Sequence, residues 1–412
     1  DEDPPEDTQN HIDEIIGIEG TPSPDNYSFA DIHIGENLSD EEKTFVISKL
    51  LPVRDFFNPV KKSFPNPAMP DFARMAIKVR EGTTPWAQRP YSLSAPKKEI
   101  MKGIIHSQLK RGMIQPSISP YASACFLVPK HGTNKWRLVI DARKLNKVVD
   151  KSSWPLPRID EIFDRLHGAK YFSSLDLQDG FHQCPIEEGS RKYTAFITPF
   201  GLYEYTSVLQ GFSVSPNFFQ YVVDRILTGM GLEPAENNSD KPYSETPEES
   251  TANLKDDNCH VYIDDVLVWG TDLETHMDRL VRVIKRLLRF NLRAKSTKCC
   301  IAMDKLPFLG SLISPEGRSP LKEKTDAIDR IQKPTGPKAL TRLQALLGLA
   351  NFYRDHIENY SDITDPLHDL TKHNRKVTRD WNEQHDKALE RLKLAFKSPK
   401  LLVFPDFDRP WK

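Results

Sequence analysis

Residues 259–270 read CHVYIDDVLVWG, and this stretch decides the fold of the region around it. Two short apolar runs, 261–263 and 266–269, flank the adjacent carboxylates Asp264 and Asp265. β-Branched and aromatic residues favour strands, so the stretch predicts a hairpin with the Asp-Asp pair at its turn. Two like charges this close repel each other unless they are protonated or neutralised, and a divalent cation neutralises them well. Because Asp is also a common turn residue, an ordinary hairpin stays open as the alternative.

The size and composition of the chain indicate a folded protein. Its 412 residues suffice for two or three domains, and 38% hydrophobic residues support packed cores. A mean hydropathy of −0.54, without an 18-residue apolar run, excludes a membrane span. The five cysteines have neither zinc-like nor secreted-framework spacing, which indicates a reducing compartment. The chain lacks an initiator Met and a signal peptide, so we expect a fragment of a longer protein.

The net charge of −1 conceals an uneven distribution. Residues 1–50 carry two lysines against fourteen acidic residues, and residues 229–258 carry two lysines against eight, so the remainder carries +17. A body this basic suits a polyanionic partner such as nucleic acid. The plainer alternative is that lysine and arginine only solvate helix faces.

The periodicity of the remaining chain predicts intermixed strands and helices, hence an α/β or α+β centre, followed by a helical lobe. Residues 171–177 predict a strand that breaks at 178–180 and then re-enters a strand. Residues 229–258 lose all periodicity and predict a mobile, dispensable acidic insertion. Helices are expected over 39–51, 94–112, 158–168, 217–229, 273–290, 322–331, 338–357 and 381–396, and hairpins over 125–141 and 306–314.

Asp176 is the natural third carboxylate for the Asp264–Asp265 pair. It ends an apolar strand at the point where the chain leaves the sheet. A two-metal phosphoryl-transfer site needs carboxylates from separate strands around two cations roughly 3.5–4 Å apart. A lone Asp at a strand end is usually a cap. The interpretation of Asp176 as a metal ligand therefore depends on its combination with Asp264 and Asp265.

Four ordered motifs, FSSLDLQDGFHQ, LQGFSVSPNFFQ, YIDD and FLG, resemble the palm motifs of a reverse transcriptase. The flanks SPYASACFLVPK, KWRLVIDARKLNKVV and LLGLANFYRDHIENYSDITDPLHDLTK resemble gypsy-type (Metaviridae) LTR-retrotransposon enzymes, with vertebrate retroviral enzymes as the next relatives. The resemblance covers the chain from about residue 38 to its end and implies an α+β right-hand polymerase fold, with basic fingers, a palm on a small antiparallel sheet and a helical thumb. The implied domains are an acidic linker 1–38, an N-terminal extension 39–93, fingers 94–160 with 183–209, palm 161–182 and 210–310, and thumb 311–412.

The resemblance also implies a role for each matching residue. Asp176, Asp264 and Asp265 would be catalytic metal ligands, helped by the Leu177 carbonyl. Phe181 would exclude a ribose 2′-hydroxyl, although an ordinary core aromatic is the commoner fate of a Phe. Lys298 is a candidate general acid, although such a lysine is usually only a surface residue. The nucleotide-binding residues would be Lys130, Arg137, Asp179, Gly180, Phe181 and Gln210, and the primer and template would contact Gly211, Tyr262, Phe308, Leu309 and Gly310.

The activity that this resemblance implies is RNA- and DNA-directed DNA synthesis from dNTPs with two Mg²⁺ ions, or Mn²⁺ in their place. The partners would be an RNA or DNA template with a DNA or RNA primer, in a monomer or homodimer. The location would be a cytoplasmic virus-like particle with a nuclear phase. The chain stops where an RNase H domain would begin, so we expect polymerisation without RNA cleavage.

Two departures and two rival functions stay open. TSVLQGF replaces the Met-Pro-Phe-Gly string of gypsy enzymes, and the acidic stretch 229–258 is longer than the usual link. One rival is a domesticated, catalytically silent nucleic-acid-binding or scaffold protein, against which the intact carboxylate set argues. The other is a two-metal nuclease, in which Phe181 and Gln210 would have no purpose.

Overall fold

The computed structural model describes residues 29–57, 65–66, 69–129, 135–151, 154–232, 245–256 and 258–407. It divides the chain into two compact units, one of residues 1–157, 173–268 and 274–302, and the other of residues 158–172, 269–273 and 303–412. Within the described ranges, no helix is both long enough and apolar enough to span a bilayer.

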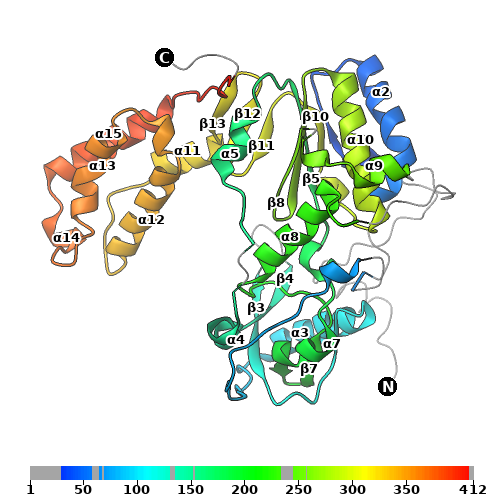
Figure 1. The fold of residues 1–412 in the computed structure, drawn as a ribbon. Coiled ribbons are helices and arrows are strands. Elements are labelled where there is room, and N and C mark those ends of the chain that lie inside the picture. Colours follow the sequence, from blue (N-terminus) through cyan, green and yellow to red (C-terminus); the bar gives the residue numbers. More distant parts are fainter. Residues whose placement is uncertain are drawn as a thin grey trace. The chain divides into compact units, whose positions relative to one another are not determined.

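The first unit is built around a five-stranded sheet that contains the 259–270 hairpin (Figure 1). Its strands β8 and β9 run antiparallel, as predicted, whereas the edge strand β1 runs parallel to β10. The sheet is therefore mixed, and the expectation of an antiparallel sheet is wrong for this edge. The strand order is β1 (His33–Ile34), β10 (Cys300–Met303), β5 (Tyr171–Asp176), β9 (Asp265–Gly270) and β8 (Cys259–Tyr262).

The predicted linker over residues 1–38 is wrong for its last ten residues. Phe29–Asp31 forms the short helix η2, β1 pairs with β10, and Ile32 and Leu38 are buried. A strand of two residues has no readable period, so only its pairing with a distant strand defines it. Helix α2 (Asp40–Leu50) then begins, close to its predicted start, with a cap in which Ser39 and Glu42 form a reciprocal capping box.

A second five-stranded sheet in this unit contains the predicted basic hairpin. Antiparallel β3 and β4 pair in register from Cys125 with Ile140 to Pro129 with Trp136. Helix α3 packs against β2 and β4. The strand order is β2 (Ile114–Pro116), β7 (Gly201–Tyr205), β6 (Phe196–Thr198), β3 (Ser123–Pro129) and β4 (Trp136–Ile140), and the helices nearby are α3 (Ala95–Lys110), α4 (Arg143–Val148) and α7 (Glu188–Arg191).

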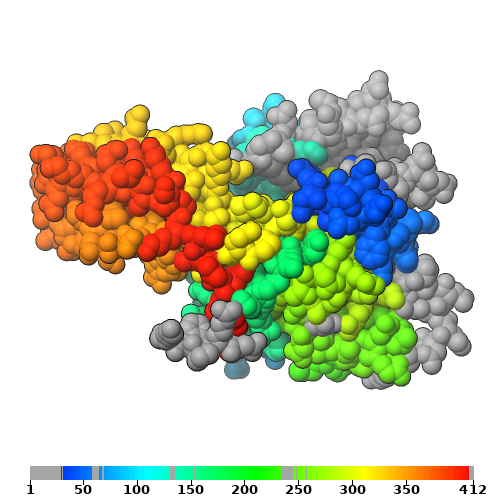
Figure 2. Space-filling model, turned by 90° about the horizontal axis from the view of Figure 1, so that it is seen from above, coloured from blue at the N-terminus to red at the C-terminus, as the bar shows by residue number. Residues whose placement is uncertain are grey.

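Two amphipathic helices pack on the elements of the central sheet. Helix α8 (Ser215–Thr228) packs against β8, and α10 (Leu273–Arg289) buries a stripe that includes Met277, Leu280 and Ile284. Helix α2, blue in Figures 1 and 2, lies at the surface of this unit, where Lys49 pairs with Asp278 of α10 at 2.6 Å. Both long helices match their predicted ranges to within two residues.

Two segments differ from their predicted conformation. The chain does not re-enter a strand after residue 180, because residues Gly180–Gln183 form the short helix α6. The unstructured insertion predicted over 229–258 is wrong for residues 245–256, which form α9 (Pro247–Thr251) and η6 (Leu254–Asp256). A capping box between Thr246 and Glu249 starts α9, and short segments of this kind carry no periodic signal.

The second unit combines a small antiparallel sheet with a helical layer. The predicted 306–314 hairpin is present as β11 (Leu306–Phe308) and β12 (Ser311–Ser314). A third strand, β13 (Gly317–Pro320), pairs antiparallel with β12. This hairpin belongs to the same unit as the helices, whereas the predicted palm ended at residue 310. The helices of the unit are α5 (Ile159–Asp164), α11 (Lys322–Asp329), α12 (Ala339–Phe352), α13 (Tyr360–Asp369), α14 (Val377–Asp380) and α15 (Glu383–Lys397).

The helical layer has its own hydrophobic core, which includes Leu343, Leu346, Leu367, Leu392 and Phe396. Helix α13 packs against both α12 and α15 (Figure 1, orange to red). Sequence reasoning missed α13 because Pro366 lies inside it, and proline normally ends a helical pattern.

Candidate active site

The turn between β8 and β9 is formed by Ile263 and Asp264, because Tyr262 pairs with Asp265. The predicted Asp-Asp turn is therefore shifted by one residue: Asp264 lies in the turn, and Asp265 is the first residue of β9. Ile263 has φ 57°, a left-handed conformation that β-branched residues rarely adopt. Such a conformation persists only where surrounding contacts hold it.

Asp176 ends β5, the strand next to β9, and so meets the turn from a separate strand. The backbone N–H of Leu177 donates to the carbonyl oxygen of Asp264 at 3.2 Å. The pKa of Asp264 rises to about 7, mainly because the carboxyl is buried and also because Asp265 and Asp176 lie nearby. Burial and Asp176 also raise the pKa of Asp265. The three predicted carboxylates therefore form one electrostatically coupled group.

This group suits cations rather than free anions. One carboxylate oxygen of Asp264, Oδ1, is buried without a hydrogen-bond partner among the described residues. The ammonium of Lys298 sits 2.7 Å from Asp176 Oδ2. The structure contains no ready-made metal cage, since the described ranges hold no group of three or more His, Cys, Asp and Glu side chains that could bind an ion. The Lys298 ammonium neutralises part of the charge on Asp176 in this structure.

Gly180 lets the chain approach Asp264 closely. A Cβ at this position would lie 2.7 Å from Asp264 Oδ1 and 2.9 Å from a ring carbon of Phe219. The preceding residue, Asp179, is in the left-handed region with φ 49°, and its carboxylate pairs with Arg111 at 2.7 Å. The next residue, Phe181, is half-buried and packs edge-on against Phe219. Residues 179–181, at the start of α6, are thus tightly held beside the carboxylates.

A second loop, at Gln210 and Gly211, is exposed and turns at Gly211 with φ 84°. Asn146 of α4 holds it in place. Its amide nitrogen donates to the Gly211 carbonyl at 3.2 Å, and its amide oxygen accepts from the Ser213 N–H at 2.8 Å. Sequence reasoning missed Asn146 and Arg111, because their partners are distant in the chain.

Arg137 lies exposed on β4, opposite Val128. Its charge acts on His182 of α6, whose pKa falls to about 4, mainly because the ring is buried and also because Arg111 and Arg137 are nearby. Lys130, the other predicted cation of this hairpin, lies outside the described residues.

Three of the predicted primer and template contacts, Phe308, Leu309 and Gly310, lie at a two-residue turn in the second unit. Phe308 pairs with Ser311, and Leu309 and Gly310 have φ 44° and 83°. The hydroxyl of Tyr353 donates to the Gly310 carbonyl at 2.5 Å. Tyr262, the remaining predicted contact residue, ends β8 and is half-buried.

Comparisons with known proteins find relatives over much of this chain. Residues 128–313 match the family model described as "Reverse transcriptase (RNA-dependent DNA polymerase)". The chain is 33% identical over 316 residues to the retrovirus-related Pol polyprotein of transposon 412 from Drosophila melanogaster, a match that covers 76% of this chain. These matches support an LTR-retrotransposon reverse transcriptase. The Drosophila gypsy Pol polyprotein is similar at 29% identity over 369 residues, or 85% of this chain.

Solved reverse transcriptase structures share the fold, and the predicted α+β right-hand polymerase class is confirmed. A foamy viral protease-reverse transcriptase in complex with dsDNA aligns with a TM-score of 0.73 and 27% identity, covering 91% of this chain and 71% of that one. The foamy viral protease-reverse transcriptase described as dRH, in complex with dsDNA, aligns with a TM-score of 0.75 and 25% identity, covering 97% of this chain and 62% of that one. The chain spans about a quarter to a third of the two Drosophila polyproteins, 23% and 33%.

Proposed function

We propose that this reverse transcriptase chain is an RNA- and DNA-directed DNA polymerase that joins a dNTP to a primer 3′-hydroxyl. The observation that carries the proposal is the coupled group of Asp176, Asp264 and Asp265, with a buried Asp264 oxygen that lacks a partner among the described residues. Phosphoryl transfer needs positioning and charge neutralisation more than covalent chemistry, and three convergent carboxylates provide the anchor for both.

The donor set fits hard divalent cations, and we propose two Mg²⁺ ions, with Mn²⁺ able to replace them. The three carboxylates and the Leu177 carbonyl would hold them. The Leu177 carbonyl oxygen is available to a cation. The hydrogen bonds of the bridge between residues 177 and 294 are accepted by the carbonyls of Asp176 and Arg293 instead. When bound, the ions would supply activation of the attacking hydroxyl and neutralisation of the leaving pyrophosphate.

The surrounding residues would bind and select the nucleotide. Backbone N–H groups of Asp179 and Gly180 would face the triphosphate, while Lys130 and Arg137 would bind its phosphates. Gln210, on the loop held by Asn146, would line the nucleotide pocket. Phe181, fixed against Phe219, would exclude a 2′-hydroxyl and so select dNTPs.

Lys298 is the proposed general acid for the pyrophosphate. Its ammonium lies against Asp176, at the place where positive charge is needed, and cation binding to Asp176 would free it to face the leaving group. Gly211 and Tyr262, together with the Phe308–Leu309–Gly310 turn, are the proposed contacts to an RNA or DNA template and its primer. The +17 charge outside the two acidic segments supports a nucleic-acid partner.

The test is extension of a DNA primer on a defined RNA template, and on a DNA template, with and without divalent metal. We expect extension that depends on Mg²⁺ or Mn²⁺ and on dNTPs. A parallel filter-binding measurement gives the affinity for the primer–template. Binding without extension under both metals would contradict the proposal and would favour a scaffold protein.

A further inference from the structure

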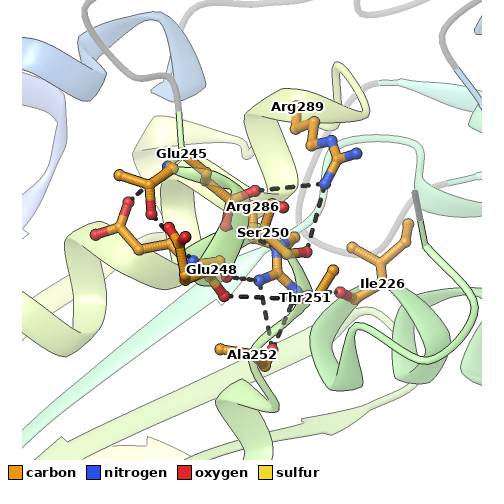
Figure 3. Close-up of polar contacts among 10 residues, drawn as sticks. Ile226, Glu245, Glu248, Ser250, Thr251, Ala252, Arg286 and Arg289 are labelled. Carbon is orange, nitrogen blue, oxygen red and sulfur yellow. Dashed lines mark hydrogen bonds and ion pairs between the residues drawn. The ribbon is translucent and has the colours of Figure 1, made fainter. Parts of the chain in front are cut away.

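Segment 245–256 is anchored to the first unit by a buried arginine. Arg286 of α10 is fully buried, and its Nε donates to Glu245 at 2.7 Å (Figure 3). Its other nitrogens donate to the carbonyls of Ile226 at the end of α8 and of Glu249 and Ala252 in the segment. A buried guanidinium needs all these acceptors, so the segment completes the packing of α8 and α10.

The far end of this segment carries a second, independent contact to α8. Lys255 pairs with Asp224 at 2.7 Å, and both side chains are largely buried, at 19% and 11% exposure. The same oxygen of Asp224 accepts from the amide nitrogen of Gln220, one helical turn earlier, at 3.1 Å. The other Asp224 oxygen accepts from the Trp154 indole at 3.1 Å, so the carboxylate is held on both sides.

Gln220 is fully buried and joins this pair to the catalytic hairpin. Its amide nitrogen donates to the Val261 carbonyl at 3.1 Å, and its amide oxygen accepts from the Ile263 N–H at 2.7 Å. Reversing the amide would set its oxygen against Asp224 and the Val261 carbonyl and its nitrogen against the Ile263 N–H. Asp224 therefore fixes which end of the amide faces the turn.

Resting on the proposed function, we propose that Lys255, Asp224 and Gln220 form a polar relay through which segment 245–256 positions the catalytic turn. Gln220 holds Ile263 in its left-handed conformation, and this places Asp264 beside Gly180. Lys255 neutralises the buried carboxylate that orients Gln220. Gln220, Asp224 and Lys255 are positioning residues, since none of them is among the metal-binding carboxylates.

The relay predicts that Lys255→Met loosens a hairpin to which Lys255 itself makes no hydrogen bond. The matched control is Lys49→Met, which removes an ion pair of similar length, 2.6 Å, in the same unit. Amide hydrogen exchange over residues 259–270 of the metal-free protein should quicken by about threefold or more in Lys255→Met. It should stay unchanged in Lys49→Met. Equal exchange in the two variants would overturn the relay, whether or not the protein polymerises DNA.

Single-nucleotide incorporation gives the second readout. Gln220→Met should lower kcat by about tenfold or more and leave the Kd for primer–template within about twofold, because only the turn is displaced. Combining it with Lys255→Met should cost little more, because the relay is already cut. Unchanged kcat in Gln220→Met, or multiplicative losses in the double variant, would contradict the relay. If Gln220→Met does not fold, the kcat of Lys255→Met against that of Lys49→Met decides in the same way.

A rescue experiment separates positioning from general packing. Asn adopts the left-handed region more readily than Ile, so Ile263→Asn should recover part of the kcat lost in Gln220→Met. No recovery of kcat when Ile263→Asn is combined with Gln220→Met would show that Gln220 does not act through residue 263. A wild-type chain that extends no primer under Mg²⁺ or Mn²⁺ would refute the proposed function alone, because the hydrogen-exchange test does not depend on activity.

Discussion

Ionising Asp264 in the turn between β8 and β9 costs free energy, so the stability of the folded chain depends on pH. Because the pKa of folded Asp264 rises from 3.8 to about 7, the folded state keeps this proton longer than the unfolded chain. The free energy of unfolding of the metal-free protein should therefore fall as the pH rises from about 4 to about 7 and then level off.

Asp264→Asn tests this cost directly. The variant should raise the melting temperature of the metal-free protein at pH 8 by a few degrees and leave it nearly unchanged at pH 4. Scanning calorimetry of both proteins at both pH values measures it. A lower melting temperature for the variant at pH 8 would mean that the buried carboxylate is not strained by its neighbours.

Gly180→Ala should disable the site without unfolding the protein. Its new Cβ would meet Asp264 Oδ1 at 2.7 Å and displace the carboxylate, so we expect kcat to fall by about a hundredfold. The control is Gly189→Ala, since a Cβ at Gly189 meets nothing within 4 Å. Near-normal kcat in Gly180→Ala, measured by primer extension, would show that the close approach does not matter.

What the residue pattern could predict was the carboxylates, not what holds them. Asp176, Asp264 and Asp265 stood out because acidic residues end or interrupt apolar strands. Gln220 lies among the apolar residues of a helix, and a polar residue in such a place needs a buried partner, but the sequence does not name that partner. The turn was misplaced by one residue because Ile263, a poor turn former, adopts positive φ through tertiary contacts.

At the scale of elements, α6 presents the proposed sugar gate. Phe181 is held edge-on against Phe219 of α8, with ring centroids 5.4 Å apart. Phe181→Ala should admit ribonucleotides, lowering the dNTP preference by about tenfold or more because the ring that blocks the 2′-hydroxyl is gone. Competing incorporation of dNTPs and NTPs measures this. An unchanged preference would remove Phe181 from the gate.

Segment 245–256 should matter to stability through its buried ion pair. Glu245→Gln would leave the fully buried Arg286 without its carboxylate, and we expect a loss of about 3 kcal/mol in the free energy of unfolding. The double variant Glu245→Gln with Arg286→Met removes the unpaired charge and should recover part of that loss. Denaturant unfolding measures both, and a double variant less stable than the single one would contradict this account.

Elements with long amphipathic runs were predictable, and short or interrupted ones were not. The α10 stripe from Met277 to Leu288 repeats every three or four residues and needs no partner to be recognised. By contrast, β1, α6 and α9 have two, four and five residues, and distant contacts stabilise them. The expectation of an unstructured insertion was wrong for residues 245–256 for the same reason, because Lys255 and Glu245 find their partners only in the folded chain.

At the scale of the whole molecule, the charge distribution separates binding from catalysis. In the proposed function, the +17 outside the two acidic segments would supply attraction to phosphates, and the three carboxylates would supply the chemistry. Affinity for a primer–template should therefore weaken steeply with salt and depend little on any single carboxylate. The family and the fold class were readable from motifs.

Primer extension on an RNA template tests whether the carboxylates at the turn catalyse DNA synthesis. The wild-type chain and Asp264→Asn are compared at the same fraction of bound template. We expect Mg²⁺-dependent extension by the wild type and a loss of at least about a thousandfold in Asp264→Asn, with the binding affinity of both within about threefold. Extension by Asp264→Asn at the wild-type rate would contradict it.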